Sequence, residues 1–144
     1  MSRRLAILIS GRGSNMAAIL AAMAAPGAAA QPVLVAANRP EAAGLDHAEG
    51  QGVPTVCVDH RRWGKDREGF ERALSAGIEA AGADLVVLAG FMRLLTPWFV
   101  ARWRDRLINI HPSLLPLVRG LDTHARALQT GVAVHGCTVH LVRD

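Results

Sequence analysis

Short apolar runs and helical segments alternate along this chain, and no other feature limits its fold so strongly. The first run, residues 5–9, is apolar throughout and ends at Ser10-Gly11-Arg12-Gly13. A continuous apolar run that enters a glycine-containing turn is typical of a strand buried on both faces. Residues 15–23 follow with strong helix formers at apolar spacing, and Pro26-Gly27 ends this predicted helix.

The same alternation continues through the rest of the chain. Strands are predicted at 33–37, 53–58, 85–89, 107–110 and 136–142, and helices at about 41–51, 67–81, 97–103 and 123–130. Strands that alternate with helices favour a parallel sheet, because each helix carries the chain back to the edge where the next strand starts. We predict one domain of the α/β class: a doubly wound, mostly parallel, Rossmann-like sheet with helices on both faces.

Composition excludes several classes of protein. Hydrophobic residues make up 51% of the 144, too many for a disordered chain. The net charge is +4, but the arginines are scattered, so we expect no nucleic-acid partner. Residues 5–9 are too few to span a membrane or to serve as a signal sequence. Cys57 and Cys137 lie far apart without the spacing of a metal site or a disulfide framework, which favours a reducing, cytoplasmic setting and no bound metal.

The turn at residues 10–15, between the first strand and the first helix, is the first candidate binding site. Its glycines allow a ligand to approach the backbone closely, and the start of the helix offers unpaired N–H groups to an anion. Met16 stands where a dinucleotide-binding motif has its third glycine, and no Lys-Ser/Thr pair follows the glycines. These residues favour a small phosphate monoester, and a simple helix cap built on Ser14 and Asn15 is the alternative.

Residues 90–95, directly after the predicted strand 85–89, form the second candidate. Met92 and Leu95 would line an apolar slot while the backbone amides and carbonyls of the loop bind a heterocycle. Ordinary packing of these side chains is the alternative interpretation.

Asn109-Ile110-His111-Pro112 is the third candidate. Alternate side chains of an extended segment share a face, so Asn109 and His111 would lie together while Ile108 and Ile110 face the core. Pro112 lacks a backbone donor and ends the strand. An amide beside an imidazole can stabilise and protonate a developing oxyanion, and without an evident Ser or Cys nucleophile, direct transfer to a bound amine fits best. The remaining histidines are interpreted as structural: His47, His60, His124, His135 and His140.

Several motifs in the same order resemble the phosphoribosylglycinamide formyltransferase family, the folate-dependent enzymes of purine synthesis. They are Ile9-Ser10-Gly11-Arg12-Gly13-Ser14-Asn15, Leu88-Ala89-Gly90-Phe91-Met92-Arg93-Leu94-Leu95, residues 108–116, Gly120-Leu121-Asp122-Thr123-His124, His135-Gly136 and Thr138-Val139-His140. The resemblance covers nearly the whole chain, and several motifs at matching spacing are far more specific than any one of them.

The resemblance implies that a formyl group passes from 10-formyltetrahydrofolate to the amino group of glycinamide ribonucleotide in de novo purine biosynthesis, without a metal. It implies that Gly13, Ser14 and Asn15 bind the substrate phosphate. It also implies that Asn109 lies near the formyl oxygen and that His111 is the proton donor. The implied folate site comprises Arg67, Met92, Arg93, Leu94, Leu95 and Asn109.

The chain departs from the family pattern near its end. The family's catalytic aspartate, which would keep the imidazole protonated, belongs to an acidic loop shortly beyond Asp144. We therefore expect residues 1–144 to be one formyltransferase domain that lacks its C-terminal portion and has strongly reduced activity. Leu117-Val118-Arg119 also differs from the basic and aromatic residues common in the family. We expect this difference to affect the lid over the substrate without changing the class of reaction.

Three alternatives follow from the same residues. A 10-formyltetrahydrofolate hydrolase shares the Asn-x-His arrangement but carries an additional N-terminal domain, whereas the first strand here begins at Leu5. A methionyl-tRNA formyltransferase is disfavoured by the glycine-containing turn and by the lack of a basic stripe. The third alternative is not an enzyme in practice: a fragment that binds its ligands but turns over little. We expect small-molecule substrates as partners and no association with a membrane. A homodimer is left open.

Overall fold

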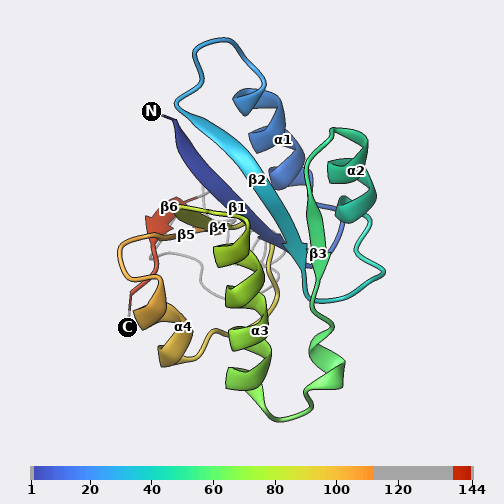
Figure 1. The fold of residues 1–144 in the computed structure, drawn as a ribbon, viewed down its shortest axis with the longest axis vertical. Helices are drawn as coiled ribbons and strands as arrows, with labels where there is room; N and C mark the ends of the chain where they lie inside the picture. The colour runs from blue at the N-terminus through green and yellow to red at the C-terminus, as the bar shows by residue number, and fades with distance from the viewer. Residues whose placement is uncertain (1, 112–137, 144) are drawn as a thin grey trace, which may run out of the picture.

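A six-stranded sheet forms the centre of the computed structural model, which describes residues 2–111 and 138–143 (Figure 1). The strands lie in the order β3-β2-β1-β4-β5-β6. Their bounds are β1 Arg3–Ile9, β2 Ala30–Ala37, β3 Thr55–Cys57, β4 Leu85–Leu88, β5 Leu107–His111 and β6 Thr138–Leu141. The helices are α1 Ser14–Met23, α2 Gly44–Gly50, η1 His60–Arg62, α3 Arg67–Ala80 and α4 Pro97–Arg102.

The sheet is mostly parallel, as predicted. All pairs from β3 to β5 run in parallel, and only β6 pairs antiparallel with β5. The carboxyl ends of the parallel strands therefore share one edge of the sheet. The chain adds β2 and β3 on one side of β1, and β4 and β5 on the other. The strand order thus reverses between β1 and β4, where open α/β sheets bind their ligands.

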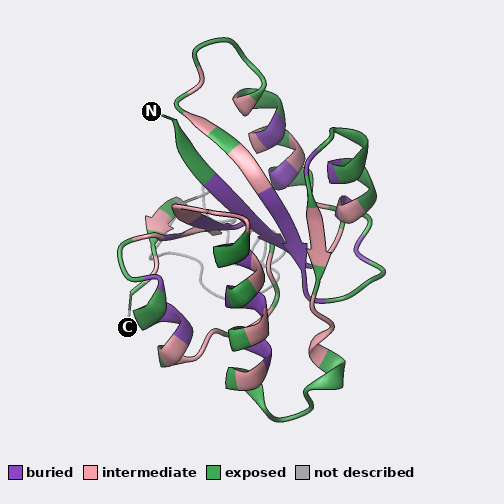
Figure 2. Ribbon diagram, viewed as in Figure 1, coloured by how far each residue is buried: buried purple, intermediate pink, exposed green. Residues whose placement is uncertain are grey.

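Each face of the sheet has its own apolar core, because side chains of successive strand residues point to opposite faces. Ile7 and Ile9 of β1 pack with Met16 and Leu20 of α1 on one face. Ala6 and Leu8 pack on the other face with α3 and α4 and with Trp103, the fully buried residue that follows α4. Figure 2 shows the buried residues concentrated in the central strands and on the inner sides of the helices. The doubly wound fold with helices on both faces is confirmed.

The helix α3 illustrates how sequence pattern positions an element. Asp66 accepts a hydrogen bond from the Gly69 backbone N–H, which caps the start of the helix. Phe70, Leu74 and Ile78 recur every four residues and are all buried. Burying each such side chain stabilises the fold by roughly 1.5–3 kcal/mol. The helix is thereby held against the sheet, and its first residue, Arg67, contacts the loop that follows β4.

Several predicted boundaries differ from the structure. The helix α2 begins at Gly44 instead of about residue 41, because residues 39–42 form a turn closed by the Ala42 N–H on the Arg39 carbonyl. The strand β3 is shorter than predicted, and the 3-10 helix η1 was not predicted. The helix predicted at 123–130 and the first residues of the predicted strand 136–142 lie outside the described residues. None of the described helices is long and apolar enough to cross a membrane.

Candidate active site

A cleft of about 420 Å³ opens at the edge of the sheet where the strand order reverses. Its walls come from the segments that follow β1, β2 and β4, together with η1. The lining residues are Ser10, Gly11, Arg12, Gly13, Ser14, Asn15, Asn38, Arg39, His60, Ala89, Gly90, Met92 and Arg93. Five of the residues predicted for binding, namely Gly13, Ser14, Asn15, Met92 and Arg93, are therefore neighbours on one cleft.

The glycine turn, residues 11–15, presents the start of α1 to the cleft. Gly13 is the N-cap with a φ of 72°, a left-handed conformation that favours glycine, and no side chain caps the helix. Ser14 and Asn15 belong to the first turn of α1, so the interpretation of these two residues as the helix cap is wrong. The N–H groups of an uncapped first helical turn have no partner within the helix and can bind an anion.

A second glycine, Gly44 at the start of α2, supports the glycine turn from behind. Its N–H donates to the Gly11 carbonyl at 3.0 Å. A Cβ at this position would lie 2.5 Å from Ile9 Cδ1 and 3.0 Å from the Arg12 carbonyl oxygen. Only glycine lets the two backbones approach this closely, so Gly44 helps to set the conformation of the turn.

The β4 loop, residues 90–96, is held at three points by side chains from other elements. The Met92 N–H donates to the Ser10 hydroxyl at 2.7 Å. Arg67, the first residue of α3, donates to the Leu94 carbonyl at 2.6 Å. At the end of the loop, the N–H and hydroxyl of Thr96 both donate to the buried carboxylate of Glu71.

The apolar side chains of the β4 loop differ in exposure. Met92 and Leu94 are 59% and 82% exposed, which is unusual for large apolar residues. Leu95 is partly buried against the core beneath α3 and α4 and does not line the cleft. The loop thus offers two uncovered apolar side chains, Met92 beside the cleft and Leu94 beside Arg67.

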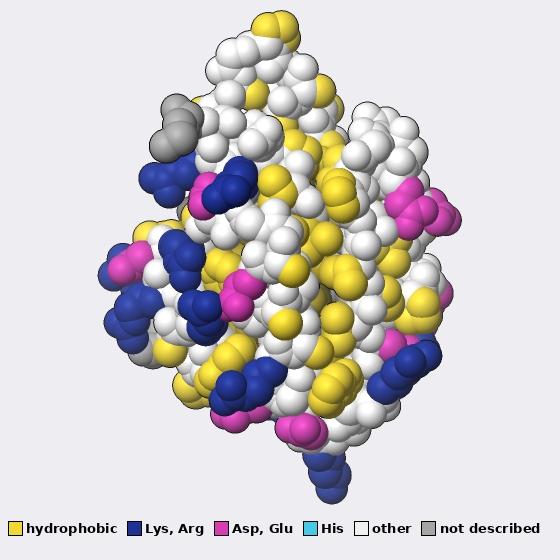
Figure 3. Space-filling view, in the orientation of Figure 1, with side chains coloured by type: hydrophobic (Ala, Val, Ile, Leu, Met, Phe, Trp, Pro, Cys, Tyr) yellow, Lys and Arg dark blue, Asp and Glu magenta, His cyan; other side chains and the backbone are white. Residues whose placement is uncertain are grey.

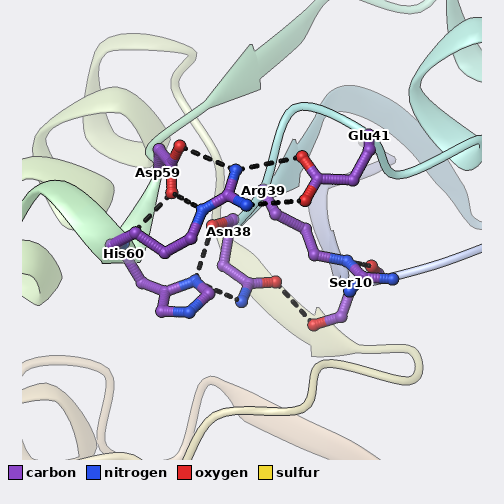
Figure 4. A network of polar contacts seen from close by, with 7 residues as sticks. Ser10, Asn38, Arg39, Glu41, Asp59 and His60 are labelled. Atoms are coloured by element: carbon purple, nitrogen blue, oxygen red, sulfur yellow. Dashed lines mark hydrogen bonds and ion pairs between the residues drawn. The ribbon is translucent and has the colours of Figure 1, made fainter.

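A buried polar network joins the ends of β1 and β2 (Figure 4). The Ser10 hydroxyl donates to Asn38 Oδ1 at 2.6 Å, and the Asn38 amide nitrogen lies 3.0 Å from His60 Nδ1. Ser10 and Asn38 are both buried, and the Met92 N–H also donates to the same hydroxyl. One serine therefore connects the glycine turn, the end of β2 and the β4 loop.

Asn109 and His111 lie in β5, next to β4. Asn109 pairs in register with Leu88 of β4 and with His140 of β6, and its Nδ2 atom is 3.5 Å from His140 Nε2. His111 is the last residue of β5, so its backbone lies at the same edge of the sheet as the cleft. Ile110 is half-buried against the α1 face, and Ile108 is also half-buried. Neither Asn109 nor Arg67 lines the cleft itself.

The charged groups around the cleft are unevenly distributed. Arg12, Arg39 and Arg93 line it, and no Asp or Glu is among its described lining residues. The nearest acidic groups, Glu41 and Asp59, both pair with Arg61. Hydrogen bonds from Arg61 lower the pKa of Asp59 to about 2. Hydrogen bonding from its own backbone, and then from Arg61, lowers the pKa of Glu41. The described lining of the cleft is therefore positively charged.

On the face shown in Figure 3, Lys and Arg side chains are interspersed with acidic ones and form no continuous basic band. Among the described residues, no three His, Cys, Asp or Glu side chains come together as metal ligands would.

Three polar lining residues were missed by reasoning from the sequence: Asn38, Arg39 and His60. Ser10 was part of the predicted turn, but its hydrogen bonds to Asn38 and Met92 were not predicted. A polar Asn-Arg pair directly after a predicted strand was a usable signal, because strand ends meet at the ligand-binding edge. His60 was interpreted as structural, and its position on the cleft depends on η1, which has no strong sequence signature.

The comparisons with known proteins agree on one family. A family model described as "Formyl transferase" matches residues 3–144. The human trifunctional purine biosynthetic protein adenosine-3 is 45% identical over 141 residues, which are 98% of this chain and 14% of the human protein. The phosphoribosylglycinamide formyltransferase of Escherichia coli is 43% identical over 138 residues, 96% of this chain and 65% of that enzyme.

Solved structures give the same result at the level of the fold. The phosphoribosylglycinamide formyltransferase of Coxiella burnetii, solved in complex with CHES, aligns with a TM-score of 0.93 at 42% identity, and covers 100% of this chain and 67% of that one. The Brucella melitensis enzyme also gives 0.93, at 45% identity, with 98% and 73% covered. The chain thus spans about a seventh of the trifunctional relatives and about two thirds of the bacterial enzymes.

Proposed function

This chain belongs to the formyl transferase family, and from that premise we propose that it transfers a formyl group from 10-formyltetrahydrofolate to the amino group of glycinamide ribonucleotide, in purine biosynthesis. One observation carries the proposal. The uncapped glycine turn and the β4 loop, which are suited to a phosphate and to a heterocycle respectively, line the same cleft.

The phosphate of the ribonucleotide binds at Gly13, Ser14 and Asn15. The first turn of α1 supplies backbone N–H donors, and the positive end of the helix favours a dianion. The positively charged cleft attracts the same group, since its described lining carries arginines and no carboxylate. A side chain at Gly13 would be strained by the positive φ and would lie 2.9 Å from Met16 Cε.

The folate binds along the β4 loop. Met92 and Leu94 are exposed apolar side chains that a bound heterocycle would cover. The backbone groups of the loop that are not tied to Ser10, Arg67 or Glu71 remain available to hydrogen-bond the heterocycle. Arg93 adds a polar side chain at the cleft, and Leu95 holds the loop against the core beneath it. Arg67 adds a positive charge beside Leu94 for the acidic tail that folates carry.

Asn109 and His111 carry the chemistry. The substrate amine attacks the formyl carbon, and the Asn109 amide donates to the oxyanion that forms on the formyl oxygen. His111 acts as the proton donor. As the tetrahedral intermediate collapses, the bond from the formyl carbon to the folate nitrogen breaks. That nitrogen gains a proton and the amine nitrogen loses one, so charge and protons balance without a covalent enzyme intermediate.

The proposed setting is the cytoplasm. Cys57 is an exposed, unpaired thiol, which is typical of proteins kept in reducing compartments. Burial of part of its side chain raises the pKa of the Cys57 thiol, so it is not activated as a nucleophile.

The decisive experiment is an assay of formyl release from 10-formyltetrahydrofolate with and without glycinamide ribonucleotide. We expect release only when the amine is present, with formylglycinamide ribonucleotide as the product. Release that is independent of the amine would instead identify a hydrolase. Tight binding of both ligands by calorimetry with no transfer would identify a binding protein. His111→Ala should abolish transfer while leaving both dissociation constants within about threefold, because a proton donor acts mainly on the transition state.

A further inference from the structure

Arg39 differs from several of the described arginines in what its guanidinium contacts. Ion pairs with Asp or Glu engage Arg4, Arg61, Arg102 and Arg143. Arg72 and Arg106 lie over tryptophan rings. Arg39, by contrast, lines the candidate active-site cleft and has no ion-pair partner among the described residues. A guanidinium without a counterion at such a place is suited to a ligand that brings its own negative charge.

Among the described residues, one hydrogen bond orients the Arg39 guanidinium. Its Nε–H donates to the Ser10 carbonyl at 2.7 Å, directly before the glycine turn (Figure 4). This contact uses one of the five N–H donors of the group and leaves the terminal amino groups for other acceptors. The guanidinium is therefore docked against the same turn whose N–H groups face the cleft.

Arg61 pairs with both neighbouring acidic side chains, Glu41 and Asp59. Glu41 lies only two residues from Arg39, yet both its carboxylate oxygens contact Arg61, at 2.9 and 3.1 Å. Asp59 is held by the same arginine at 2.9 and 3.0 Å. In Figure 4 the Arg39 side chain extends toward Ser10 and away from Asp59. Without Arg61, Glu41 would be the natural counterion of Arg39.

From this geometry we propose that Arg39 is a phosphate-binding residue of the cleft, and that the Arg61–Glu41–Asp59 cluster preserves it for the ligand. The inference rests on the proposed function for the identity of the phosphate ester. Arg39 supplies the full positive charge that backbone N–H groups lack, and its planar donors can pair two oxygens of one phosphate group.

The test compares two ligands by calorimetry: glycinamide ribonucleotide and glycinamide riboside, which lacks the phosphate. Arg39→Gln should weaken ribonucleotide binding about 10- to 100-fold, the range expected for a hydrogen-bonded charge pair. Riboside binding should change less than about twofold. Arg39→Lys keeps the charge but loses the Nε contact, so its affinity for the ribonucleotide should lie between those of the unmodified protein and Arg39→Gln. Arg62→Gln is the matched control, because it removes a nearby exposed positive charge that does not line the cleft.

The role of the cluster is tested by a second pair of variants. Arg61→Gln should weaken ribonucleotide binding severalfold, because Glu41 is then able to pair with Arg39. Adding Glu41→Gln to that variant should restore the affinity. Failure of the double variant to recover would contradict the protective role of Arg61.

The outcomes separate this inference from the proposed function. If the unmodified protein binds the ribonucleotide and Arg39→Gln binds it equally well, the inference is wrong and the proposed function stands. If the unmodified protein binds neither the ribonucleotide nor the folate, the proposed function fails. If Arg39→Gln weakens ribonucleotide and riboside equally, Arg39 shapes the cleft without contacting phosphate, and the inference is again wrong.

Discussion

The glycine turn and the β4 loop line one cleft but are held in place by different means. The turn is supported by backbone against backbone: Gly13 adopts a left-handed conformation, and Gly44 approaches closely enough to donate to the Gly11 carbonyl. The β4 loop is supported by side chains from elsewhere, namely Ser10, Arg67 and Glu71. A turn that offers its own N–H groups to an anion must stay uncovered, so other backbone segments support it from behind. A loop that binds a larger group is instead pinned at selected points.

This difference explains which parts were predictable. The turn was found from its sequence because glycines next to a helix start are a local signal. The supports of the β4 loop were not found, because Ser10 and Met92 are 82 residues apart and only the sheet brings them together. Glu71 left a weak local signal as an acidic residue on the buried side of α3, beside Phe70 and Leu74.

The alternation of strands and helices predicted the fold class, but not every boundary. The start of α2 at Gly44 follows the turn at 39–42, and the Gly44 N–H also donates to Gly11, far away in the sequence. The positions of Asn109 and His111 in β5 were predictable from the apolar run and from Pro112. The roles assigned to both residues remain predictions.

The largest effect is expected at Gly44, which should damage the glycine turn alone. In Gly44→Ala, the new methyl group would meet Ile9 Cδ1 and two backbone carbonyls. We expect a loss of stability of about 1–3 kcal/mol from overpacking. A displaced turn loses hydrogen bonds to the charged phosphate, so ribonucleotide affinity should fall on the order of 100-fold. Folate affinity should change little, as measured by calorimetry.

Gly50→Ala is the control for this substitution. Gly50 ends the same helix, and a Cβ there would meet nothing within 4 Å. It should leave both affinities unchanged. If Gly44→Ala weakened folate binding as much as ribonucleotide binding, the glycine turn and the β4 loop would not be supported independently.

A smaller effect, on the other ligand, is expected at Ser10. Ser10→Ala removes the buried hydroxyl that accepts from the Met92 N–H and donates to Asn38 Oδ1. Leaving these two groups unpaired should lower the stability by about 1–3 kcal/mol. Folate affinity should fall about tenfold because the β4 loop loses one anchor. Ser75→Ala is the control: it removes a buried hydroxyl that accepts from Trp103 and should lower stability without changing folate affinity. Equal folate affinities in the two variants would show that Ser10 does not position the loop.

A still smaller effect is expected at the far end of the loop. Glu71→Gln keeps an oxygen acceptor for the Thr96 N–H, and its NH2 group can donate to the Thr96 hydroxyl, so both contacts are kept only as weaker, uncharged hydrogen bonds. We expect folate affinity to fall about threefold and ribonucleotide affinity to stay the same. Fluorescence titration with a folate analogue measures this change. An unchanged affinity would mean that the end of the loop is held well enough by packing.

The smallest effect concerns the acidic cluster beside the cleft. The pKa of Asp59 is lowered from 3.8 to about 2 by Arg61, so its ionised form stabilises the folded state. That contribution is complete above about pH 4 and is lost as the pH falls toward 2. The urea midpoint of the protein should therefore fall over this range, and Asp59→Asn should reduce the fall. An identical acid dependence in the variant would rule out this contribution.

The central claim is that one cleft holds the ribonucleotide phosphate on the glycine turn and the folate on the β4 loop. Amide chemical shifts followed by NMR during separate titrations test it most directly. Glycinamide ribonucleotide should shift the N–H signals of Gly13, Ser14 and Asn15, and glycinamide riboside should not. A folate analogue should shift those of Met92 to Leu94. Ribonucleotide binding that leaves the Gly13, Ser14 and Asn15 signals in place would contradict the account.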